Sequence, residues 1–108
     1  MDYREQFTDE QLAYIIEQGL IYMCACPAQV AEGVRKLREI HRYQGTCINN
    51  PDNESAVHGV IANSVALAHQ TMQDCLEDII RMEGWNRTTL EMPAHLRQRQ
   101  LKELLADD

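Results

Sequence analysis

The chain has 108 residues and a formal net charge of −7, with 44% hydrophobic and 25% charged residues. This balance is typical of one globular domain rather than of a disordered or fibrous chain. The negative charge argues against binding to nucleic acid and to anionic lipid, because both depend on Lys and Arg.

The sequence also indicates a compartment and a fold class. No apolar run approaches the roughly 20 residues that span a bilayer, and the letters MDYREQFTDE lack the basic and apolar regions of a signal peptide. We therefore expect a cytoplasmic protein that does not bind membranes, with its cysteines as reduced thiols. Aromatic residues are few while Ala, Leu, Ile, Val and Met are common, which favours an all-α fold.

The first helix is predicted over residues 8–23. Thr8 can cap its N-terminus, Gln11 completes a capping box, and Phe7 can meet Leu12 as a hydrophobic staple. Apolar residues then recur at three- and four-residue spacing, so one face of this helix should be buried.

The second helix is predicted over residues 27–44. Pro27 suits the first helical position, which leaves Cys26 near the N-cap, and Gly45 is a natural stop. One face of this helix is apolar, and a neighbouring stripe carries three arginines. We interpret that stripe as a solvated flank or as one surface of a dimer; its members are Arg35, Arg38 and Arg42.

The letters TCINNPDNE form the clearest loop, and a long third helix is predicted after them, over residues 54–83. It contains no proline and keeps a helical apolar period up to Met82, which gives a rod about 45 Å long. Gly84 ends it, and an irregular tail leads to Pro93 and a short C-terminal helix over 93–106. Its apolar positions are Leu96, Leu101, Leu104 and Leu105.

Short connections favour antiparallel neighbours, so we expect an antiparallel three-helix up-down-up bundle with the C-terminal helix packed across it. The third helix is longer than the first two. Because long exposed apolar faces are rare on monomers, we expect the tail or a second copy of the chain to cover it, and we expect a homodimer.

Cys24, Cys26, Cys75 and His69 are the candidate metal ligands. The antiparallel third helix is expected to return His69 and Cys75 to the level of the Cys24–Cys26 turn, and thiolates with imidazole are ligands that suit Zn²⁺ or Cu(I). A C-x-C pair lacks the two C-x-x-C motifs that are typical of structural zinc sites, and a buried cysteine usually behaves as a small hydrophobic residue. The leading interpretation is therefore that these cysteines pack in the core, and we expect no cofactor.

Two further groupings have weaker patterns. Cys26 at a helix N-terminus would have a lowered thiol pKa, and Cys24 could resolve its oxidised form, which is a redox alternative. His41, Cys47 and His58 gather near the predicted helix–loop–helix connection, but a lone histidine on an apolar face is more often a hydrogen-bonded core residue.

The sequence contains no phosphate loop, no nucleotide fingerprint and no Ser-His-Asp order. The first hypothesis for function is therefore a non-enzymatic helical interaction module that binds itself through the long third helix and the tail, with another protein as a further candidate partner. The alternative is a thiol-based metal or redox sensor that uses Cys24, Cys26 and Cys75. An enzyme with a pocket between helices is a third possibility that no residue pattern supports.

Overall fold

The computed structural model describes residues 3–21, 25–48 and 55–106, and every regular element in those ranges is a helix. The all-α prediction is confirmed. The helices are α1 (Asp9–Ile21), α2 (Ala25–Ile48), α3 (Ser55–Glu83) and α4 (Ala94–Ala106).

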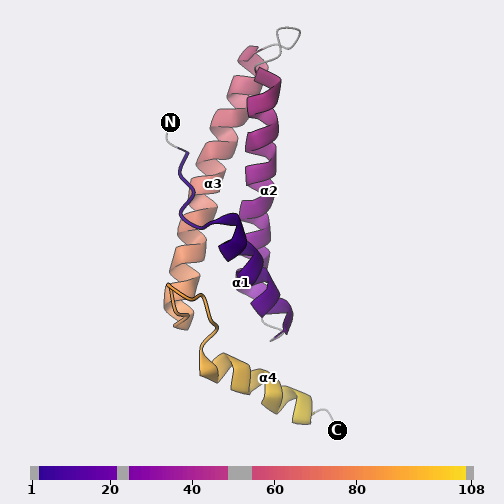
Figure 1. Cartoon of the computed structure of the whole chain (residues 1–108), viewed down its shortest axis with the longest axis vertical. Helices are drawn as coiled ribbons and strands as arrows, with labels where there is room; N and C mark the ends of the chain where they lie inside the picture. Colours follow the sequence, from indigo (N-terminus) through magenta and orange to yellow (C-terminus); the bar gives the residue numbers. More distant parts are fainter. Residues whose placement is uncertain (1–2, 22–24, 49–54, 107–108) are drawn as a thin grey trace.

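A long antiparallel hairpin of α2 and α3 forms the body of the molecule (Figure 1). The two helices contain 24 and 29 residues, and the molecule is elongated, with extents of 61 × 26 × 18 Å. α3 is one continuous helix, as the sequence predicted. Its length follows from the absence of proline between residues 55 and 83, together with an apolar face that packs on α2 throughout.

The predicted capping box at the start of α1 is present. The backbone N–H of Gln11 donates to Thr8 Oγ1 at 3.0 Å, and the backbone N–H of Thr8 donates to Gln11 Oε1 at 2.8 Å. Phe7 and Leu12 are both fully buried in the same hydrophobic cluster, as expected of a staple. Local chemistry therefore sets both where α1 begins and which way its chain enters the core.

α1 packs across the lower half of the hairpin, against α2 (Figure 1). Its buried side chains include Leu12 and Ile15, which join the core formed with Val34 of α2 and with Leu76 and Ile80 of α3. Within the described ranges, the backbones of α1 and α3 make no close contact. The upper half of the hairpin is therefore two helices deep, while the lower half is three elements deep.

The ends of α2 differ from the prediction. The helix begins at Ala25, so Cys26 and Pro27 both lie in its first turn, where a missing N–H breaks no intrahelical bond. It also continues through Gly45 to Ile48, because packing against α3 outweighs the modest helix penalty of one glycine. The rest of the predicted Asn-Pro loop, residues 49–54, lies outside the described residues.

The segment that follows α3 closes the lower end of the core. Trp85, Leu90 and Met92 are all buried against the side chains of α1 and α3. Gly84 turns the chain with a φ of 81°, and Leu90 also has a positive φ, of 60°. The tail predicted as irregular therefore forms a compact cap. The burial of three large side chains there compensates for an unfavourable backbone conformation at Leu90.

α4 does not pack across the bundle as predicted. Leu96 in its first turn contacts the core, but the helix makes no close backbone contact with the other three described helices and leads away from the hairpin (Figure 1). The prediction was wrong because the compact cap of residues 84–92 already covers the lower end of the core. Among the described residues, no helix is both long and apolar enough to cross a membrane.

Replacing Gly84 by alanine should destabilise the protein by about 1–2 kcal/mol, because an L-residue at that φ is strained although the space around it is open. Gly45→Ala is the matched control. Gly45 also has open space, but it lies in a regular helix, so alanine should raise the free energy of unfolding by roughly 0.5–1 kcal/mol. Urea unfolding followed by circular dichroism measures both free energies of unfolding. Changes of the same sign in the two variants would contradict the assignment of these two backbone conformations.

Candidate functional site

The most connected polar cluster in the described part of the chain is centred on Arg38 of α2, whose side chain is fully buried. Its Nε donates to His69 Nε2 at 3.0 Å, its Nη1 to Asp9 Oδ1 at 2.9 Å and its Nη2 to Gln73 Oε1 at 3.0 Å. A buried cation is costly unless its donors are satisfied, and here all three nitrogens of the guanidinium have acceptors. We call Asp9, Arg38, His69 and Gln73 the arginine network.

The arginine network joins three helices, since its residues come from α1, α2 and α3. It also holds the segment that precedes α1. Gln73 Oε1 accepts the backbone N–H of Gln6 at 2.8 Å, and Gln73 Nε2 donates to the carbonyl of Arg4 at 2.7 Å. A single buried glutamine thus supplies the hydrogen bonds that residues 4–6 would otherwise lose on docking against α3.

Arg42 extends the network toward solvent. Its Nη2 lies 3.0 Å from Glu5 Oε1 and 3.0 Å from Asp9 Oδ2. The hydrogen bond from Arg38, followed by that from Arg42, holds the pKa of Asp9 below its usual value. The arginine stripe predicted as a solvated flank or a dimer surface is therefore partly wrong: Arg38 is interior, Arg42 pairs within the chain, and Arg35 is exposed beside Glu32.

His69 is a neutral hydrogen-bond acceptor in this structure. Its Nε2 receives the Arg38 donor, so the ring proton belongs on Nδ1, which is buried without a hydrogen-bond partner in the described part of the chain. Burial, and then the charge of Arg38, lower the pKa of His69 to about 4. A ring that is buried, neutral and already bonded at Nε2 is poorly placed to bind a metal or to exchange protons with a substrate.

Tyr3 covers this histidine. The tyrosine ring stacks on His69 with centroids 4.6 Å apart and on His41 with centroids 3.8 Å apart and an interplanar angle of 2°. Contacts between aromatic rings contribute stability beyond the area that they bury. His41 thus contacts the N-terminal segment, while His58 bonds Gln44 at 2.6 Å, so the two histidines predicted near Cys47 have separate partners.

A second arginine links the lower cap to the N-terminal segment. Arg87 makes a two-pronged ion pair with Glu77, at 2.8 Å for the closest atoms, and donates to the carbonyl of Gln6 at 3.2 Å. Its guanidinium lies 4.2 Å above the ring of Phe7. Cation–π contact and planar pairing are both favoured by arginine over lysine.

The helix register decides where the predicted thiol site residues lie. Gly33 of α2 faces Met72 of α3, whose Cε lies 3.4 Å from the position of a Cβ at Gly33. Arg38 pairs with His69 in the same register. Cys26 is about three turns earlier in α2 than Arg38, or about 18 Å along the axis. The structure therefore brings His69 to Arg38 and not to Cys26.

Of the remaining predicted ligands, the structure describes Cys26 and Cys75. Cys26 is exposed in the first turn of α2, and Cys75 is half-buried on α3. The residues that the structure describes contain no group of three or more His, Cys, Asp or Glu side chains able to hold a metal ion. Cys24 lies outside the described residues, so a thiol site that includes it stays a prediction.

Sequence reasoning missed the arginine network because it took the buried faces to be apolar. A signal was present on α2, where Arg38 follows the apolar Val34 by four residues and so lies on the same helix face. In the structure both side chains are fully buried. On α3 the buried face runs through His69 and Gln73, so it is rotated relative to the stripe of purely apolar residues. The third acceptor of Arg38, Asp9, and the backbone groups that bond Gln73 come from residues 4–9, and helical periodicity carries no information about that contact.

No known family matches this chain, and comparisons with curated proteins and with solved structures found no significant similarity. Apart from His69 Nδ1, the polar groups of the arginine network bond one another and the N-terminal segment, so its geometry favours a structural role. The surfaces that the fold leaves open are therefore the candidate binding sites.

Arg38→Met should lower the free energy of unfolding by roughly 2–4 kcal/mol, because His69 and Gln73 would keep buried acceptors that lack this donor. Arg35→Met is the matched control on the same helix. That side chain is exposed and, among the residues that the structure describes, pairs with Glu32 alone, at 3.5 Å, so a change within about 0.5 kcal/mol is expected. Similar losses of unfolding free energy in both variants would show that the buried hydrogen bonds of Arg38 do not stabilise the fold.

Stability should fall as the pH drops from 6.5 toward 4. The folded-state pKa of His69, about 4, is below its ordinary value of 6.5, so the unfolded chain takes up a proton that the folded chain excludes. The contribution is fully present above pH 6.5 and is lost with a slope of up to about 1.4 kcal/mol per pH unit.

Urea unfolding of the native chain and of His69→Gln between pH 7 and pH 4.5 tests this pH dependence. The glutamine carbonyl can still accept from Arg38, so the variant should fold and should have a flatter pH profile. Identical profiles for the two proteins would show that His69 is not the group responsible.

Proposed function

We propose that this protein is a non-enzymatic helical interaction module of the cytoplasm that associates with a second copy of itself, built on an up-down-up arrangement of α1, α2 and α3. The observation that carries the proposal is a row of exposed apolar side chains on α3. It lies in the half of the hairpin that α1 does not reach. We call Val57, Val60 and Leu67 the α3 seam.

The side chains of the α3 seam are large and open to solvent, with exposed fractions of 49%, 66% and 56%. Their spacing of three and seven residues puts them on one face of the helix, and Ser64 and Thr71 continue that face. This is the spacing of the seam by which two helices pack in a coiled coil. An exposed apolar row that only Ser64 interrupts, on an acidic chain, supports a protein partner.

The hairpin beneath the seam has little apolar interior of its own. There the side chain of Gln44 is buried and bonds His58, and the next fully packed layer lies at Val65 and Ala66. Two helices bury less apolar surface than three, so this half gains most from a further layer. An antiparallel or parallel pairing of two hairpins would supply that layer as a four-helix arrangement.

Val60→Glu combined with Leu67→Glu should convert an associated protein into a monomer, because both carboxylates would have to be desolvated at the seam. Light scattering coupled to size-exclusion chromatography measures the mass over a range of concentrations. The control is Met82→Glu, an even more exposed side chain near the other end of α3, which should leave the mass unchanged. A monomer at all concentrations for the native chain would overturn the proposal.

A further inference from the structure

Residues 3–6 run along α3 before the chain turns into α1, and we call them the N-terminal strap (Figure 1). The side-chain amide of Gln73 holds the backbone of the strap at two points, by accepting from the N–H of Gln6 and donating to the carbonyl of Arg4. The hydrophobic core cluster begins only at Phe7. The strap is therefore docked by polar and aromatic contacts and not by core packing.

The side chains of the strap meet the polar side chains of both long helices. The ring of Tyr3 stacks on His41 of α2 and on His69 of α3. Glu5 Oε1 accepts from Arg42 Nη2 at 3.0 Å. The strap thus covers the polar strip that α2 and α3 form around His69.

One guanidinium couples these contacts to His69. Arg38 Nε donates to His69 Nε2, and Arg38 Nη2 donates to Gln73 Oε1, the same oxygen that accepts from the N–H of Gln6. Glu5 Oε1 also lies 4.0 Å from Arg38 Nε. A displacement of this guanidinium therefore disturbs two of the groups that dock the strap.

A proton on His69 Nε2 is incompatible with this arrangement. The nitrogen would become a donor facing the Arg38 donor, and two positive charges would meet in a buried site. On α3 itself, residues 65–73 contain no other charged or titratable side chain. The titratable and charged groups that face His69 from the strap, α1 and α2 are Tyr3, Glu5, Asp9, Arg38, His41 and Arg42.

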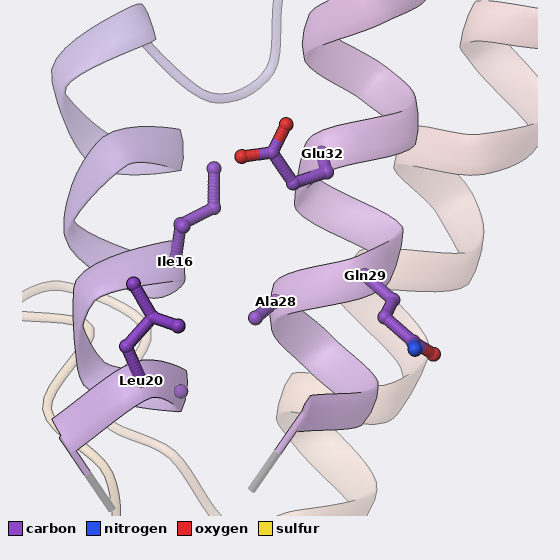
Figure 2. Close-up of a pocket in the computed structure, with 6 residues that line it drawn as sticks. Ile16, Leu20, Ala28, Gln29 and Glu32 are labelled. Carbon is purple, nitrogen blue, oxygen red and sulfur yellow. The ribbon is translucent and has the colours of Figure 1, made fainter. Parts of the chain in front are cut away.

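Release of the strap leaves the core contacts in place. Phe7 and Leu12 are fully buried in the hydrophobic cluster and anchor the start of α1. At the other end of α1, Ile16 and Leu20 lie opposite Ala28 of α2 across a groove of about 380 Å³, far from the strap (Figure 2). The chain can therefore open before Phe7 without unpacking α1.

Docking of the strap also leaves two buried polar atoms without a hydrogen-bond partner in the described part of the chain. They are Gln6 Oε1 and His69 Nδ1. A buried polar atom that has lost water and gained no partner destabilises the state that buries it. Release returns both atoms to water, so the docked strap is held with a smaller margin than its bonds alone indicate.

We propose that residues 3–6 form an acid-released strap, in which a proton taken up by His69 detaches these residues from α2 and α3 while the apolar core stays folded. Detachment uncovers the polar side chains of His41, His69 and Gln73. The device lies within one chain and does not depend on the proposed self-association.

The sign of the pH effect follows from the two states of the strap. Burial, and then the charge of Arg38, lower the pKa of the docked His69 to about 4, and exposure to water on release returns it toward 6.5. The docked state is therefore fully favoured above pH 6.5. Each pH unit below 6.5 shifts the equilibrium toward release by up to about tenfold, until the pH reaches about 4.

NMR spectra of the full chain between pH 7 and pH 4.5 test the strap. The ring of Tyr3 and the backbone amide of Gln6 report docking, and the methyl groups of Leu76 and Ile80 report the core. As the pH falls, the strap signals should move toward those of a free peptide of residues 3–8, while the core signals keep their folded positions. Strap signals that stay unchanged, or that change only together with the core signals, would overturn the proposal.

His69→Gln separates this histidine from the other groups that titrate. The glutamine carbonyl can accept from Arg38 but takes up no proton, so the strap should stay docked at pH 4.5. His58→Gln is the matched control, because this histidine of α3 bonds Gln44 and does not contact the strap. Its release profile should equal that of the native chain. Release of the strap in His69→Gln at the native pH would assign the effect to another group, such as the carboxylate of Glu5, and refute the role of His69.

Tyr3→Ala provides a second measurement that leaves His69 in place. Loss of the stacked ring weakens docking, so release should occur at a higher pH, by about one unit for each tenfold loss of docking. Tyr43→Ala is the control, since Tyr43 is an exposed tyrosine of α2, and it should leave the release pH unchanged. A release pH that Tyr3→Ala does not raise would show that the stacked ring does not hold the strap and would overturn the proposal.

Discussion

A fully buried arginine is the constraint on which the rest of this structure depends. Arg38 brings a permanent positive charge into the interior, and such a charge is tolerated only where acceptors surround it. The acceptors come from three parts of the chain: Asp9 at the start of α1, and His69 and Gln73 on α3. Their convergence fixes the register of the hairpin and the height at which α1 crosses it.

The same constraint explains the asymmetry of the molecule. Below Arg38 the core is apolar and closed by the cap that Trp85, Leu90 and Met92 provide. Above it, α2 and α3 continue as a two-helix hairpin whose outer face keeps the exposed side chains of Val57 and Val60. The chain thus has a closed end, organised by the arginine network and the cap, and an open end whose apolar surface exceeds what its own residues cover.

Features that depend on local chemistry were predictable from the sequence. The capping box of Thr8 and Gln11 needs only residues three positions apart, and it forms as expected. The continuity of α3 follows from 29 residues without proline that keep an apolar period. Gly45 was misread as a stop, because the cost of one glycine in a helix is smaller than the gain from packing along α3.

The sequence by itself therefore determined the helical class, the start of α1 and the single long third helix, since each is recorded in residue types and spacings within a few positions of one another. Only the tertiary structure decided that Arg38 is interior, that His69 is an arginine's acceptor and not a partner of Cys26, and that α4 leaves the bundle. The physical reason is that a polar side chain is buried or exposed according to whether distant groups can satisfy it. Residues 3–9 meet α2 and α3 only once the chain has folded, so no periodic pattern along either helix records that meeting.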